Sequence, residues 1–377
     1  MIRRTVSVLC CVSMLAVLLS GCWDIKDIQE NAYLTALGID FVDGKYVVYV
    51  QSLDFSNVAK QEVGKPRGKA PIWVGKGVGS TLGLAFYDVL SASQLKIVWE
   101  HITAIVFSDN IMKQDIVSLL DSILRYREMR NTLWVFGTKE PIDRIFSVSP
   151  IFDMSPMLTL LHEPNEVYSQ RSYIPSVRLQ QFIALLREPG MTVLVPSITI
   201  NKESWEKDLQ ITPQLQINGL YAIYNRRQSG WFPEERLRGY RWMSRKTVEA
   251  PLYIQKGNAP QIVLTLGRPQ QKVTVATKDG KPRFNIKINI QGEVEELLRK
   301  MSEAEAERMA EEEIRKHVLQ TYSFALHSNT DIYSLRHTLY RTANAQWKKY
   351  GKELRLDDNS IDIDVKVKIK HAGIQKL

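Results

Sequence analysis

The sequence has little cysteine. Only three of its 377 residues are Cys, at positions 10, 11 and 22, and the first two lie inside an amino-terminal apolar stretch. If that stretch is removed by processing, a single cysteine remains. This excludes an intramolecular disulfide framework and a cysteine-based metal site from the rest of the chain.

Motifs of common enzymes are also missing. The six histidines are scattered, none in the His-Glu-x-x-His pattern of a zinc site, and no Gly-x-Ser-x-Gly sequence offers a nucleophile elbow. The glycine-rich stretch 75–81 lacks the lysine of a phosphate-binding loop, because Gly79 stands in its place. We expect it to lead into a helix capped by Ser80 or Thr81. We expect no catalytic residue, no metal and no cofactor.

Long hydrophobic runs are absent except near the start. Residues 6–19 form a mostly apolar, uncharged run behind Arg3 and Arg4. The run is too short to cross a bilayer core of about 30 Å comfortably, but it suits an export signal. Gly21 and Cys22 then form a lipobox: the Cys22 thiol would accept a diacylglyceryl group, and cleavage before it would remove residues 1–21. The alternative is an ordinary signal or anchor with a chance cysteine.

Charge and composition describe a packed protein. Lys and Arg number 50 against 41 Asp and Glu, a net charge of +9 that is spread along the chain, so we expect no nucleic acid partner. An anionic membrane surface is the better expectation. Apolar residues make up 44% of the chain, which favours two or three globular domains and excludes wholesale disorder.

The hydrophobic pattern predicts a mixed α/β (α+β), multi-domain fold. In an N-terminal α/β region, 22–200, a hairpin turning at residues 43–44 precedes alternating helices and strands. The expected helices are 80–93, 111–125 and 177–186, the expected strands are 101–107, 133–136 and 192–200, and 61–70 is an expected loop. Pro196 favours a sheet edge for the last strand, and 201–212 is an expected boundary loop.

A C-terminal α+β region is predicted over 213–371. It begins with a strand over 215–224, followed by a meander with strands at 262–266, 272–277 and 284–290. Two long helices follow, the first capped by Ser302 and acidic in its first turns, the second over 331–350. We interpret the acidic stretch as a solvated face. Residues 361–369 alternate as a half-buried strand, in which Asp362 and Asp364 would keep the exposed face soluble rather than form a catalytic pair.

A basic segment follows the predicted helix 111–125. Arg125, Arg127 and Arg130 lie between that helix and the next strand, with Glu128 among them. They could compensate the helix dipole and pair with Glu128. Alternatively they could anchor the carboxylates of a partner protein. These four residues are our candidates for a partner interface.

The motifs resemble those of the Ger(x)C family, the lipoprotein C subunits of spore germinant receptors. The resemblance begins with Gly-Cys-Trp-Asp at 21–24 and the strand end Gly38-Ile39-Asp40, and it continues through 81–85, His101 and 125–130. It closes with 331–335, 339–341, Trp347 and 365–369. The opening motif is specific, and the middle ones are weaker singly.

The resemblance implies a fold of about three subdomains, with mixed and antiparallel sheets flanked by helices. It implies a non-enzymatic subunit, anchored through Cys22 to the outer face of the inner spore membrane and assembled with the A and B membrane subunits. The sequence alone leaves two other functions open. One is a lipid-anchored solute-binding protein that captures a ligand itself, and the other is an anchored cell-wall hydrolase.

Overall fold

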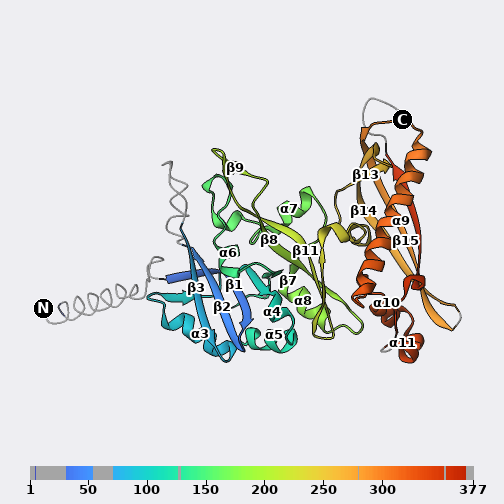
Figure 1. Ribbon diagram of the computed structural model, residues 1–377. Coiled ribbons are helices and arrows are strands. Elements are labelled where there is room, and N and C mark those ends of the chain that lie inside the picture. Colours follow the sequence, from blue (N-terminus) through green and yellow to red (C-terminus); the bar gives the residue numbers. More distant parts are fainter. Residues whose placement is uncertain are drawn as a thin grey trace.

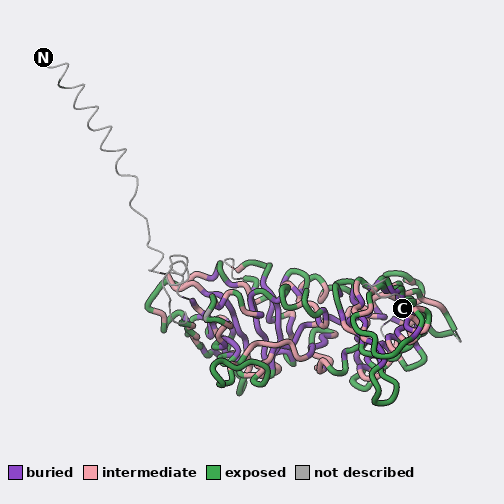
Figure 2. The backbone as a smooth tube through the Cα atoms, turned by 90° about the horizontal axis from the view of Figure 1, so that it is seen from above, coloured by how far each residue is buried: buried purple, intermediate pink, exposed green. Residues whose placement is uncertain are grey.

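The computed structural model describes Thr5 and residues 31–53, 71–125, 129–278, 280–351 and 354–370. The chain forms an elongated body (Figures 1 and 2), in which β1 begins near one end and the C-terminal sheet occupies the other. The fold is mixed α+β, with mixed and antiparallel sheets flanked by helices, as the sequence predicted.

A ten-stranded mixed sheet dominates the first part. Its main path runs β12-β11-β8-β6-β5-β1-β2-β3, while β4 pairs with β1 and β7 pairs with β6. The strands are β1 (Asn31–Val42), β2 (Lys45–Leu53), β3 (Ile72–Gly79), β4 (Lys96–Val98), β5 (Ala104–Ser108), β6 (Trp134–Thr138), β7 (Val177–Arg178), β8 (Val193–Asn201), β11 (Gln214–Tyr224) and β12 (Arg227–Pro233).

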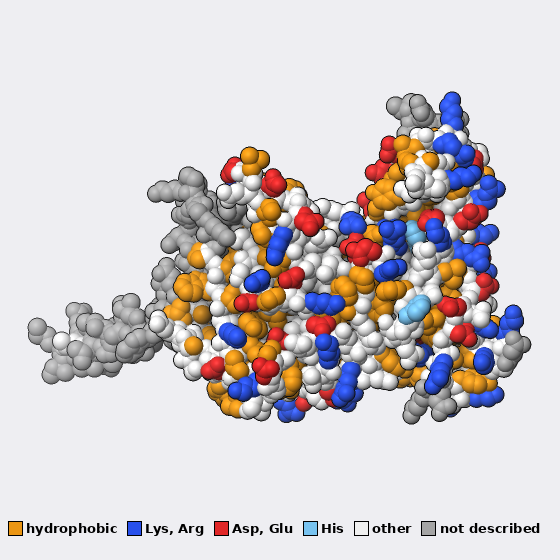
Figure 3. Space-filling view, in the orientation of Figure 1, with side chains coloured by type: hydrophobic (Ala, Val, Ile, Leu, Met, Phe, Trp, Pro, Cys, Tyr) orange, Lys and Arg blue, Asp and Glu red, His pale blue; other side chains and the backbone are white. Residues whose placement is uncertain are grey.

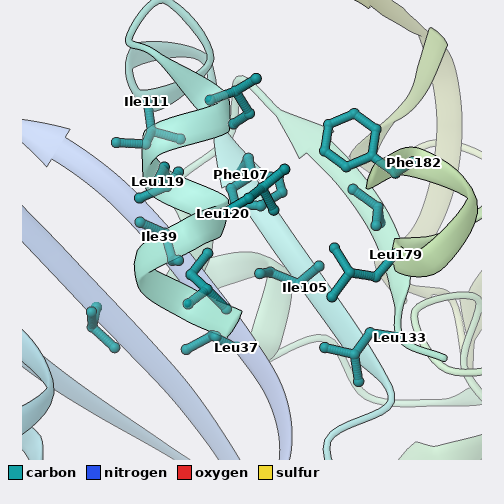
Figure 4. Packing of buried hydrophobic residues seen from close by; sticks show 14 of the residues in the cluster. Leu37, Ile39, Ile105, Phe107, Ile111, Leu119, Leu120, Leu133, Leu179 and Phe182 are labelled. Atoms are coloured by element: carbon teal, nitrogen blue, oxygen red, sulfur yellow. The ribbon is translucent and has the colours of Figure 1, made fainter. Parts of the chain in front are cut away.

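Helices cover both faces of this sheet. The helices are α3 (Leu82–Ser91), α4 (Asp109–Met112), α5 (Ile116–Leu124), α6 (Ile142–Phe146), α7 (Pro164–Gln170) and α8 (Leu179–Leu186). Figure 4 shows Leu37 and Ile105 of the sheet directed toward Leu120 of α5 and Phe182 of α8. The opposite face packs on α6 and on Leu160 and Leu161, which follow the two 3-10 helices Ile151–Asp153 and Pro156–Leu158 along the chain. Every residue of β5 and β6 is therefore buried.

Glycines allow α3 to lie directly on the edge strand β3. A Cβ atom added at Gly77 would lie 2.3 Å from the Ala85 carbonyl oxygen, and one at Gly79 would lie 2.4 Å from the Ala85 nitrogen. Thr81 caps the helix, accepting a hydrogen bond from the Leu84 N–H at 3.2 Å. The glycine-rich stretch thus serves helix packing.

The second part is a four-stranded sheet, β13-β14-β15-β16, with one long helix on one face. Its strands are β13 (Ala250–Lys256), β14 (Ala259–Lys278), β15 (Lys281–Leu297) and β16 (Ile361–Ile369), and its helices are α9 (Glu303–His327), α10 (Leu335–Thr342) and α11 (Asn344–Tyr350). Three 3-10 helices accompany them, at Glu234–Arg236, Tyr240–Met243 and Asp358–Ser360. The alternation predicted for 361–369 is confirmed, because buried and exposed residues alternate throughout β16.

The two parts meet in a shared hydrophobic cluster. Leu220 of β11 and Phe232 of β12 pack with Ala325 of α9 and with Ile332. Because β11 and β12 pair with the ten-stranded sheet, that sheet continues past residue 213. The division into regions 22–200 and 213–371 stays a prediction.

Two predicted helices are broken. The helix expected over 111–125 consists of α4 and α5, since Asp115 accepts hydrogen bonds from the Val117 and Ser118 N–H groups and starts a new helix. The helix expected over 331–350 consists of α10 and α11, separated at Ala343, which has φ −140° and ψ 61°.

Two strand predictions and one loop prediction were also wrong. Segments 262–266 and 272–277 belong to one strand, β14, whose pairing shifts register between Gly267 and Gln270. Strand β8 lies inside the sheet despite Pro196. It pairs with β6 only through Gly137 and Ser197, so few backbone N–H donors of β8 are needed on that side. The expected loop 201–212 contains a small hairpin, β9 (Glu206–Lys207) and β10 (Gln210–Ile211). The predicted loop 61–70 lies outside the described residues.

Candidate partner interface

The basic segment lies at the C-terminal end of α5. Arg125 is the C-cap residue, and its guanidinium binds Asp121 one turn earlier at 2.8 Å, with both side chains exposed. The hydrogen bond from Arg125 to Asp121 raises the pKa of the arginine. Arg127 and Glu128 lie outside the described residues. The first partner of Arg125 is therefore Asp121, an acid that the sequence prediction did not name.

Arg130 borders a cleft of about 170 Å³ at the end of the sheet where β5 and β6 begin. The cleft is also lined by His101, Thr103 and Arg178, with Glu100 as its acid. Two arginines separated by 48 positions thus share one cleft, which can bind an anionic group.

Arg178 is held by its neighbours. Its guanidinium carbon lies 3.3 Å from the centroid of the Trp134 ring, and it donates a hydrogen bond to the Thr132 carbonyl oxygen. Partial burial lowers the pKa of Arg178. Stacking on Trp fixes the plane of the guanidinium, and its remaining donors are then oriented for a planar carboxylate.

A buried polar network supports the base of this cleft. His162 Nδ1 lies 2.6 Å from the Thr103 hydroxyl, and Nε2 lies 3.0 Å from Gln51 Oε1. The Gln51 amide in turn donates to the Phe146 carbonyl oxygen, and the Trp134 ring donates to the His162 carbonyl oxygen. Burial lowers the pKa of His162 to about 3, so the ring is neutral and both of its nitrogens are hydrogen-bonded. This histidine is structural.

The acidic face of α9 has a defined role. The Glu311 and Glu307 carboxylates accept hydrogen bonds from the Val367 and Ile369 N–H groups of the edge strand β16, at 3.1 and 3.0 Å. Lys368 binds Glu303 at 3.0 Å. The interpretation of a merely solvated face was wrong, because these acids satisfy the open edge of a sheet.

A second cleft lies where α7 approaches β8 and β11. Its volume is about 130 Å³, and apolar residues such as Phe136 and Leu215 line it. Arg171 and Glu234 form an ion pair of 2.7 Å at this cleft. Tyr173 lies beside them, its ring centroid 4.6 Å from the Arg171 guanidinium carbon. Burial raises the pKa of Glu234. The cleft therefore combines an apolar wall with one cation and one anion.

Other chemistry is sparse in the part of the chain that the structure describes. Within it, no group of three or more His, Cys, Asp or Glu side chains could hold a metal ion. Within the same residues, no helix has the length and apolar character needed to span a bilayer. Asp362 and Asp364 are exposed on β16 and lie on one face with Lys366 and Lys368.

Sequence reasoning missed Arg178 and the Arg171–Glu234 pair. Their partners lie far away along the chain: 46 positions separate Arg178 from Thr132, and 63 separate Arg171 from Glu234. No short spacing marks such pairs, so only the fold reveals them.

Known protein families and relatives are similar to this chain. The spore germination protein N-terminal domain matches residues 24–200, and the spore germination B3/GerAC-like C-terminal domain matches residues 218–373. Spore germination protein KC of Bacillus subtilis (strain 168) is 22% identical, covering 95% of this chain and 94% of its own. Spore germination protein A3 of the same organism is 23% identical over 76% of this chain and 73% of its own.

A solved structure agrees with the fold. The crystal structure of the GerBC protein superposes with a TM-score of 0.53 at 15% sequence identity, covering 92% of this chain and all of that chain. The two domain matches together span most of the sequence. The chain belongs to the Ger(x)C family of spore germination proteins.

Proposed function

We propose that this chain is the lipid-anchored, non-enzymatic C subunit of a nutrient germinant receptor. It acts by assembling with the membrane subunits A and B on the outer face of the inner spore membrane. The observation that carries the proposal is the coincidence of a lipobox at Gly21–Cys22 with family matches over both halves of the chain.

The anchor supplies the physical mechanism. Two acyl chains on Cys22 retain a protein at a bilayer stably, where one chain would be marginal. Confinement to the membrane plane raises the effective concentration of the body beside its partners, so a weak interface suffices. The cleft of Arg130 and Arg178, together with Arg125, Arg127 and Glu128, is the proposed contact for acidic groups of a membrane subunit.

Substitution of the anchoring residue tests this function. In spores carrying Cys22→Ala, we expect a folded protein that leaves the membrane fraction, together with an impaired germination response. The matched control is Cys11→Ala, a same-type change inside the leader that should alter neither property. Normal membrane retention and germination with Cys22→Ala would contradict the proposal.

A second function is favoured by the cleft at Arg171. A zwitterionic solute with an apolar side chain could place its carboxylate on Arg171, its ammonium on Glu234 and its side chain against Leu215. The chain would then capture a ligand itself. A thermal-shift screen of nutrients on the full protein, repeated on Arg171→Ala, separates the two functions. Saturable stabilisation that the variant loses would favour capture.

A further inference from the structure

Exposed apolar side chains gather at the end of the body formed by β3 and α3 (Figure 3). Trp73 and Tyr87 are each 68% exposed, and three leucines near them are also exposed. We call this set the end patch: Trp73, Leu84, Tyr87, Leu90 and Leu95. Exposed apolar clusters of this kind mark surfaces that bind another molecule.

The geometry places these residues on one side. A Cβ atom added at Gly79 would meet Leu84 at 2.7 Å, and one at Gly75 would meet Val89 at 3.9 Å, so α3 runs back along β3. Trp73 is the next residue on the same face of β3 and therefore lies toward the C-terminal end of α3. Leu84, Tyr87 and Leu90 follow at intervals of three along the helix, which keeps them on one flank.

A basic residue accompanies the patch. Lys96 is exposed directly after Leu95, whereas Lys76 points to the opposite face of β3, where its ammonium lies 5.7 Å from the centroid of the Tyr49 ring. The acid on this helix, Asp88, accepts a hydrogen bond from the Val78 N–H at 2.8 Å and so protects the open edge of β3. The patch thus joins aromatic and aliphatic side chains with one lysine, Lys96, a combination that suits the interface of an anionic bilayer.

The amino-terminal chain leads to this end. Asn31, the first residue of β1, pairs with Lys96, next to Leu95. Eight residues separate Cys22 from Asn31, and a fully extended chain of that length spans at most about 30 Å. Strand β3 is also the edge of the sheet opposite to β12, which leads into the C-terminal region. An anchor at Cys22 would therefore hold the end patch close to the lipid.

We propose that the end patch rests on the headgroup layer of an anionic phospholipid bilayer, with Trp73 and Tyr87 in the interface and the C-terminal sheet directed away. This orientation deepens the proposed function and rests on it, since the anchor at Cys22 brings the patch to the membrane. A loosely tethered body would instead sample all orientations.

Site-directed labelling of the full, processed protein tests the orientation. Tyr87→Cys and Tyr253→Cys each receive an environment-sensitive fluorophore. Tyr253 is a matched control, because it is 62% exposed but lies on β13 in the distant C-terminal sheet. The labelled proteins are reconstituted in vesicles of phosphatidylcholine and phosphatidylglycerol, with or without bromine atoms on the acyl chains.

We expect bromine to quench the fluorophore at position 87 and to leave the one at position 253 unchanged. Equal quenching at both positions, or none at either, would overturn the proposal. Quenching at position 87 that vanishes on adding membrane subunits would also overturn it, because the patch would then belong to a protein partner. A second variant, Leu95→Cys, guards against misfolding at position 87 and should report the same contact.

The lipid anchor at Cys22 is tested separately in the same preparation. Protein without the added cysteine should take up no fluorophore and should float with the vesicles, because the thiol of Cys22 carries lipid. Labelling of that protein, or its absence from the vesicles, would contradict the lipid anchor rather than the orientation of the patch.

Discussion

The ten-stranded sheet is covered by helices on both faces, whereas the four-stranded sheet carries α9 on one face only. The difference is visible residue by residue: all of β5 is buried, but only alternate residues of β16 are. A sheet covered on both sides needs continuous apolar strands, and a sheet covered on one side needs alternation. The open edges differ too, since Asp88 protects β3 and glutamates of α9 protect β16.

The largest effect is expected in the doubly covered sheet. Replacing Phe107 of β5, which is fully buried, with Ala should lower the free energy of unfolding by about 3–5 kcal/mol, because a cavity remains between sheet and helices. Chemical denaturation followed by circular dichroism measures the change. Phe152→Ala is the control, since that ring is 87% exposed, and should have almost no effect. An equal loss of unfolding free energy in the two variants would show that the covered face is not a packed core.

Within the described residues, each part contains one buried histidine, His162 in the first and His317 in the second, and these two sharpen the comparison. Burial lowers the pKa of both His162 and His317 to about 3 from an ordinary 6.5. As the pH falls below 6.5 the unfolded chain therefore takes up protons first, and stability is lost until about pH 3. Each histidine should contribute a slope of about 1.4 kcal/mol per pH unit in that window.

Variants separate the two histidines. His162→Gln and His317→Gln should each reduce the pH slope of the unfolding free energy by that amount. At pH 7 the His162 variant should lose more stability, because both nitrogens of His162 are hydrogen-bonded, while Nδ1 of His317 has no hydrogen-bond partner among the residues that the structure describes. Slopes that match the unsubstituted protein would mean that neither ring is neutral in the folded state.

A smaller effect on stability is expected where the glutamates of α9 protect the edge of β16. Glu311→Ala removes the acceptor of the Val367 N–H and should cost about 1 kcal/mol. Hydrogen exchange at Val367 should become faster, while exchange at buried β5 should stay unchanged. Glu312→Ala, on the exposed side of the same helix, is the matched control. Unchanged exchange at Val367 would remove the role assigned to this carboxylate.

The smallest effect on stability is expected at the proposed interface. Arg125→Ala breaks only an exposed ion pair within one helix and should leave the unfolding free energy almost unchanged. If the basic segment binds a membrane subunit, the same variant should still slow germination. Arg315→Ala, an exposed position on α9, should leave germination unchanged. A normal germination rate with Arg125→Ala would remove Arg125 from the interface.

The sequence predicts local structure well where one residue pattern dominates. The alternation at 361–369, the Thr81 cap and the turn at residues 43–44 are all confirmed. It fails where a single side chain competes with the pattern. Asp115 restarts a helix that the apolar spacing continues, and Pro196 fits an interior strand because only one residue pair joins β8 to β6.

The candidate site was predictable only in part. Arg125 and Arg130 stand out as a local charge run, but Arg178 joins Arg130 only through the antiparallel pairing of β7 with β6 and the stacking on Trp134. The glutamates of α9 were interpreted as a solvated face because the N–H groups that donate to them lie in a strand more than fifty positions away. Contacts between segments that lie far apart along the chain leave no recognisable spacing pattern in the sequence.

Mass spectrometry of the amino-terminal peptide from membrane-extracted protein is the decisive test of the lipid anchor. We expect a chain that begins at Cys22 and carries a diacylglyceryl group on its sulfur. A retained leader, or an unmodified thiol at position 22, would contradict it.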